Sequence, residues 1–91
     1  MKTLRSNKKY ALIDRQTFIE NQSKIDNFMD FLLEENYEFY LIDYINCVCG
    51  VVEQKNGEFT CEILGGQGFS GVCKSLDESF EFLVGVSEKY V

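Results

Sequence analysis

The sequence predicts an α+β domain in which an antiparallel β-sheet of about four strands has two helices packed on it. Two observations support this class. Segments with apolar residues at helical spacing flank a central region rich in aromatic and β-branched residues, and an Asn-Gly pair interrupts that region at positions 56–57. The expected element order is β-α-β-β-β-(β)-α. A length of 91 residues with 45% hydrophobic content predicts one folded domain over residues 1–91.

The N-terminal third is expected to contain an arm, a strand and a helix. Residues 1–7 are polar and basic and predict a flexible arm, and residues 8–14 predict a short strand. Apolar residues then follow at helical spacing from Phe18 to Leu32. Asp14 could cap a long helix, whereas Ser23 with Asp26 would open a shorter one. We favour a core helix over residues 24–35.

The rest of the chain predicts strands and a closing helix. Residues 37–46 have the composition of a central strand, and residues 47–54 and 58–64 form a hairpin because Asn-Gly favours a type I′ turn. Residues 69–73 could add one short strand. Ser75 and Glu78 form a capping box that opens a helix running to the C-terminus. Gly85 costs that helix about 1 kcal/mol relative to Ala, and we expect a close approach of helix and sheet to explain it.

The composition excludes several kinds of chemistry. The chain has no His, Trp or Pro, so the commonest general base and metal ligand is missing and a Ser-His-Asp or Cys-His pair cannot form within it. Glu53 and Glu62 are only diagonal neighbours in the predicted hairpin and lack a nucleophile or metal motif, so we do not expect an enzyme. Neither a signal peptide nor a membrane span is expected, which predicts a cytoplasmic protein.

Charge is unevenly distributed along the chain. The formal net charge is −6, yet residues 1–9 contain four basic residues and no acidic ones, which leaves five basic and fifteen acidic residues over positions 10–91. An acidic surface repels nucleic-acid phosphates, so direct nucleic-acid binding is not expected except through the short basic arm. A basic protein is the expected partner.

Two motifs invite a cofactor interpretation and do not support it. Residues 66–71 spell GxGxxG, but the next helix opens only after Ser75, so a turn or bulge is expected rather than a phosphate site. The four cysteines lack C-x-x-C spacing. The hairpin register places Cys47 and Cys49 on the sheet face opposite Cys61, unless a bulge intervenes at the turn. Buried reduced thiols are therefore expected, without metal or cofactor, and redox use of Cys47 and Cys49 is the alternative.

One acidic surface is the candidate functional site. Carboxylates at four-residue spacing form a stripe on the predicted 24–35 helix, and further carboxylates and aromatic residues extend it at the helix-to-strand corner. The expected partner-binding residues are Asp26, Asp30, Glu34, Glu35 and Glu38, with Tyr37 or Tyr40 as an aromatic anchor. A solvated face that keeps the protein soluble would have the same pattern.

The resulting functional hypothesis is a small non-enzymatic inhibitor. Its carboxylates would mimic nucleic-acid phosphates and occupy a basic surface of a partner protein such as a nuclease. Small phage or mobile-element proteins of the anti-CRISPR or anti-restriction type act in this way, and the analogy is one of charge and size. The alternatives are a toxin-neutralising immunity protein and a homo-oligomeric structural or regulatory module, for example a homodimer in which the basic arm lies on a neighbour's acidic body.

Overall fold

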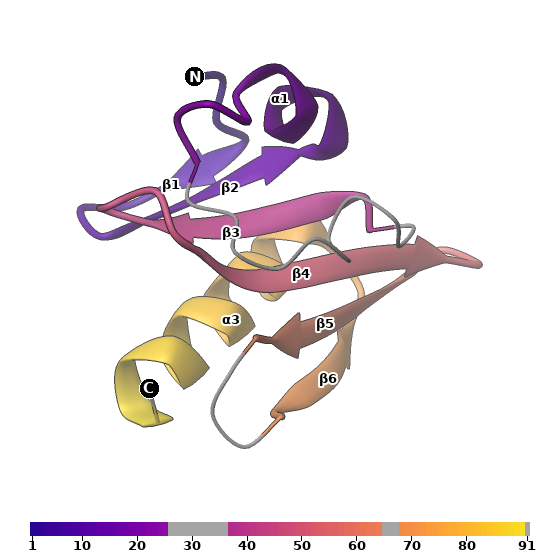
Figure 1. The fold of residues 1–91 in the computed structure, drawn as a ribbon. Helices are drawn as coiled ribbons and strands as arrows, with labels where there is room; N and C mark the ends of the chain where they lie inside the picture. The colour runs from indigo at the N-terminus through magenta and orange to yellow at the C-terminus, as the bar shows by residue number, and fades with distance from the viewer. Residues whose placement is uncertain (26–36, 65–67, 91) are drawn as a thin grey trace.

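The computed structural model describes residues 1–25, 37–64 and 68–90, and its fold is α+β (Figure 1). The sheet follows chain order, β1-β2-β3-β4-β5-β6, and every neighbouring pair is antiparallel. The predicted class is confirmed, whereas the prediction of about four strands is wrong because the sheet has six. The elements are β1 (Arg5–Ser6), β2 (Tyr10–Asp14), α1 (Arg15–Glu20), β3 (Phe39–Asp43), β4 (Val48–Lys55), β5 (Glu58–Ile63), β6 (Ser70–Cys73) and α3 (Leu76–Tyr90).

Strand β1 lies within the segment expected to be a loose arm. The Leu4 N–H donates to the carbonyl oxygen of Leu12 at 2.8 Å, and Arg5 pairs with Leu12. The turn into β2 is closed by Asn7, whose side-chain oxygen accepts the N–H groups of Lys9 and Tyr10 at 2.8 Å each. This Asx turn reverses the chain between β1 and β2, so the two-residue strand β1 can pair with β2.

Helix α1 begins at the end of β2. The Asp14 carboxylate accepts the Thr17 N–H at 2.8 Å, and Asn21 ends the helix after six residues. Asp14 is therefore a helix cap, but of a short helix. The favoured start at residue 24 is wrong, because Lys24 and Ile25 lie in a turn and a bend. The remainder of the predicted 24–35 helix lies outside the described residues.

The predicted hairpin is confirmed in its turn and in its register. Asn56 and Gly57 have φ angles of 53° and 79°, as a type I′ turn requires. Lys55 pairs with Glu58 across the turn.

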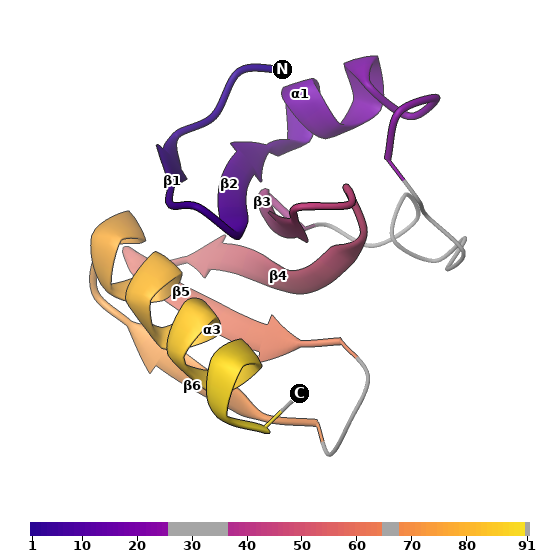
Figure 2. The ribbon, with the colours of Figure 1, turned by 90° about the vertical axis from the view of Figure 1, so that its left-hand side faces the viewer.

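The sheet is covered on both faces, and each face has its own core (Figure 2). Helix α3 packs against β4, β5 and β6, and α1 packs against β2 and β3. Period-two alternation along β3 therefore sends Leu41 to the α3 core and Tyr40 to the α1 core. The buried residues of the α3 core are Leu12, Leu41, Val52, Cys61, Ile63, Cys73, Phe80 and Leu83, and those of the α1 core are Ile13, Phe18, Ile25, Tyr40, Ile42, Val48 and Val51.

A bulge in β4 changes the predicted placement of the thiols. Leu41 pairs with Gly50 but Ile42 pairs with Val48, so Cys49 is an extra residue on β4. Cys49 consequently packs against the same core as Cys61, and the prediction that they occupy opposite faces is wrong. The bulge lies between β3 and β4, not at the hairpin turn.

Helix α3 opens with the predicted cap. The Ser75 hydroxyl oxygen accepts the Glu78 N–H at 3.1 Å, and the Glu78 carboxylate accepts the Lys74 N–H at 2.8 Å. The return bond thus reaches one residue further than in a standard capping box. A Cβ atom at Gly85 would meet no atom within 4 Å, so the expected close approach is wrong at this position. Neither described helix has the length and apolar character needed to cross a bilayer.

Candidate functional site

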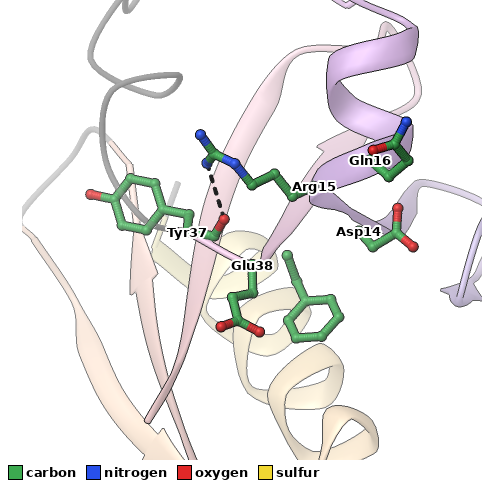
Figure 3. Close-up of a pocket in the computed structure, with 6 residues that line it drawn as sticks. Asp14, Arg15, Gln16, Tyr37 and Glu38 are labelled. Atoms are coloured by element: carbon green, nitrogen blue, oxygen red, sulfur yellow. Dashed lines mark hydrogen bonds between the residues drawn. The ribbon is translucent and has the colours of Figure 1, made fainter.

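A hollow of about 610 Å³ opens where β2 passes into α1 and residues 37–38 lead into β3 (Figure 3). We call it the α1 hollow. Its walls combine two carboxylates with one guanidinium, one amide and two aromatic rings. Its lining residues are Asp14, Arg15, Gln16, Tyr37, Glu38 and Phe39. The structure thus brings Tyr37 and Glu38, two of the predicted partner-binding residues, into one surface feature.

Main-chain hydrogen bonds fix the position of Glu38. Its carbonyl oxygen accepts the Arg15 N–H at 2.9 Å, and its own N–H donates to the carbonyl oxygen of Val52 at 2.9 Å. The residue is held between the start of α1 and β4, while its side chain is exposed. The main-chain hydrogen bonds therefore hold the backbone of Glu38 in place, and its carboxylate points into solvent.

Arg15 links the two walls of the α1 hollow. Its guanidinium donates to the carbonyl oxygen of Tyr37 at 3.2 Å and to the hydroxyl of Tyr40 at 2.9 Å. Figure 3 shows its side chain extending toward Tyr37 and away from Asp14. Arg15 therefore fastens the chain that enters β3 to the start of α1.

A hydrogen bond stabilises the charged form of one carboxylate of the α1 hollow, that of Asp14. The hydrogen bond from the Thr17 N–H holds the pKa of Asp14 below its ordinary value of 3.8. Neither Asp14 nor Glu38 forms an ion pair with another residue in the described part of the chain. The lining holds two carboxylates against the single guanidinium of Arg15, which is directed at Tyr37 and Tyr40, so the α1 hollow can attract a further cationic group.

Tyr40 does not lie on the surface. It is fully buried, and its ring stacks on Phe18 of α1 with centroids 3.9 Å apart and an interplanar angle of 12°. Tyr37 meets Tyr40 edge-on at 6.2 Å. Tyr40 is therefore a core residue that packs against Tyr37, and the predicted role of surface anchor does not fit it.

The remaining predicted partner-binding residues, Asp26, Asp30, Glu34 and Glu35, lie outside the described residues. Sequence reasoning considered Asp14 only as a cap and did not single out Arg15, Gln16 or Phe39 for this surface. The cap pattern at Asp14 could have indicated this surface, because it fixes where β2 ends and α1 begins.

The described residues were compared with the side-chain groups that metal or thiol chemistry needs. Within residues 1–25, 37–64 and 68–90, no three His, Cys, Asp or Glu side chains are grouped so that they could hold a metal ion. Burial raises the pKa of the Cys49 thiol to about 12, which keeps it in the unreactive thiol form. In comparisons with family models, curated proteins and solved structures, none matches this chain.

Proposed function

We propose that this protein is a non-enzymatic inhibitor that occupies a basic, nucleic-acid-binding surface of a partner protein. The observation that carries the proposal is the α1 hollow, in which two carboxylates lie beside aromatic residues on a backbone held by main-chain hydrogen bonds. A Lys or Arg side chain of the partner would enter it, with its charge near Asp14 and Glu38 and its stem against Tyr37. Aromatic residues beside charges are typical of binding hot spots.

The chain next to the α1 hollow strengthens the proposal. Residues 26–36 contain four carboxylates and no basic residue, and they directly precede Tyr37 and Glu38. A partner groove that normally holds phosphates would meet a dense set of negative charges in this part of the chain. The finer identity that we propose is an anti-defence protein of phage or mobile-element type, with an intracellular nuclease as its target.

The test is competition for a captured partner. Tagged protein is used to capture a nucleic-acid enzyme from host lysate at low and moderate salt, and the purified enzyme is then titrated with an oligonucleotide substrate. We expect the oligonucleotide and this protein to exclude each other, and Glu38→Lys to weaken capture by about tenfold, which corresponds to about 1.4 kcal/mol. The double variant Asp30→Lys, Glu34→Lys tests the predicted stripe in the same assay.

A matched control separates the site from net charge. Glu58→Lys makes the same charge change at the exposed end of the β4–β5 hairpin, and capture should be unaffected. Equal loss with both variants would reduce the effect to net charge and contradict the proposed site. A partner that binds its nucleic acid and this protein at the same time would contradict the inhibitory mechanism.

The alternatives lead to different observations. An immunity protein would use the same contacts against a basic toxin, so the identity of the captured partner separates it from a nuclease inhibitor. The arm-exchange oligomer has less support, because Arg5 of the basic segment is bound to Asp77 of its own chain at 2.7 Å. Recovery of this protein alone from the lysate would nevertheless favour self-association.

A further inference from the structure

A second hollow, of about 380 Å³, lies at the opposite end of β2 and β3 from the α1 hollow. Three lysines line it: Lys8 and Lys9 from the β1–β2 turn, and Lys24 from the turn that follows α1. We call this feature the lysine hollow. Segments distant in the sequence thus bring their positive charges to one place, although the chain as a whole is acidic.

These charges are available to a ligand. All three lysines are exposed, and none of them forms an ion pair within the described part of the chain. The one carboxylate in the lining belongs to Asp43, whose Oδ1 accepts the N–H groups of Ile45 at 3.0 Å and of Cys47 at 2.9 Å. Three lysines against this one carboxylate leave the hollow with a net positive charge.

An aromatic ring stands beside the lysines. Tyr44 is 78% exposed at the β3–β4 turn, and it lines the hollow together with Asn46 and Tyr10. An exposed aromatic ring offers a face on which a planar base can stack. Phosphate-binding charges and a stacking surface therefore occur together.

We propose that the lysine hollow binds a nucleoside phosphate, with the phosphates at Lys8, Lys9 and Lys24 and the base on Tyr44. The volume suits a mononucleotide and lies in the range of small-ligand sites, which begins at about 300 Å³. The same base and phosphate chemistry occurs at the end of a single-stranded nucleic acid. The inference uses none of the residues of the α1 hollow and is independent of the inhibitory function.

The experiment is a set of titrations in which binding is measured by calorimetry and by NMR of the amide groups around the lysine hollow. The probes are ATP, adenosine, inorganic phosphate and a single-stranded adenine decanucleotide, each without divalent metal. We expect ATP to bind with a Kd below about 1 mM, and adenosine and phosphate each to bind at least about tenfold more weakly. The Kd of the decanucleotide should be no lower than the Kd of ATP.

Variants make the test specific to the lysine hollow. Lys8→Gln, Lys9→Gln should weaken ATP binding by at least about tenfold, and Tyr44→Ala should lower the affinity for ATP more than for phosphate. The control Lys55→Gln, Lys74→Gln removes the same charge from two exposed lysines outside the hollow and should leave the affinity unchanged.

Three outcomes would overturn the proposal. The first is the absence of ATP binding, and the second is equal weakening by both double variants, which would mean non-specific attraction. The third is a decanucleotide affinity far above that of ATP, which would assign the lysine hollow to single-stranded nucleic acid instead. Circular dichroism of each variant ensures that lost binding is not lost folding.

Discussion

Gly71 of β6 lies directly against the ring of Phe82 in α3, so that a Cβ atom built on Gly71 would come within 2.8 Å of Phe82 Cζ. The close approach of helix and sheet that the sequence suggested at Gly85 is therefore made by a glycine of the sheet. Gly50 on β4 plays a similar part, because its Cβ atom would lie 3.2 Å from Leu83 Cδ2. Because these two strand residues are glycines without a Cβ atom, α3 can pack closely against the sheet.

Gly71→Ala should destabilise the protein by about 1 kcal/mol, because the added methyl group forces the half-buried Phe82 ring to move. Urea unfolding measures the change. Combining Gly71→Ala with Phe82→Leu should cost less than the sum of the two single variants, as expected for residues in contact.

The control for this prediction lies on the helix. Gly85→Ala places a methyl group where no atom lies within 4 Å, and it replaces a poor helix former by the best one. It should stabilise the protein by up to about 1 kcal/mol. A stabilising Gly71→Ala would contradict the packing described here.

The parts of the fold that the sequence predicted are those determined locally. The β4–β5 hairpin depends on two adjacent residues that favour positive φ, and the α3 cap depends on Ser75 and a residue three positions later. Strand β1 and the bulge at Cys49 depend on pairing with other strands, and no local pattern marks them. The thiol placement failed because one unpaired residue reverses the alternation of faces beyond it.

Replacing the cap of α1 should have an effect that depends on pH. Asp14→Ala removes the acceptor of the Thr17 N–H and should cost about 0.5–2 kcal/mol at neutral pH. The pKa of Asp14 is lowered in the folded protein, so its contribution is present above the ordinary value of 3.8 and is lost as the pH falls through the folded value. The difference between wild type and variant should therefore shrink in acid.

Asp14→Asn is the matched variant, because Asn is an equally good cap without a titrating group. It should keep most of the stability at neutral pH and show a weaker loss in acid than wild type does. Thermal unfolding at several pH values between about 2 and 7 measures both effects. Parallel acid profiles for wild type and Asp14→Asn would show that the cap charge contributes nothing.

The candidate site shows the same division between local and long-range information. Glu38 and Tyr37 were identified because they follow the acidic segment at a corner of the chain, and they line the α1 hollow. Tyr40 was misjudged because alternation along a strand assigns a side chain to a face but does not say what covers that face. Here α1 covers it, through Phe18.

The buried Tyr40 ring and its hydroxyl should contribute separately to stability. Tyr40→Phe keeps the stack on Phe18 but removes the acceptor of the Arg15 guanidinium, and it should cost about 0.5–1.5 kcal/mol. Tyr40→Ala removes the ring as well and should cost at least about 3 kcal/mol. Tyr44→Ala, at a residue 78% exposed, should change stability by no more than about 0.5 kcal/mol. Similar losses for Tyr40→Ala and Tyr44→Ala in chemical denaturation would contradict the burial of Tyr40.

The half-buried thiol of Cys49 and the buried thiol of Cys61 should make the protein sensitive to alkali. Burial raises the pKa of Cys49 to about 12 and that of Cys61 to about 11, from an ordinary value of 9.0. Both shifts favour the neutral thiol in the folded state, so their contribution is complete below pH 9.0 and is lost as the pH rises through the folded values. The free energy of unfolding should therefore begin to fall near pH 9.0, where the thiols of the unfolded chain ionise.

The variant Cys49→Ala should be less stable at neutral pH but should lose stability less steeply with rising pH. An unchanged slope in this variant, measured by urea unfolding in steps of pH, would show that Cys49 ionises in the folded protein as readily as in the unfolded chain.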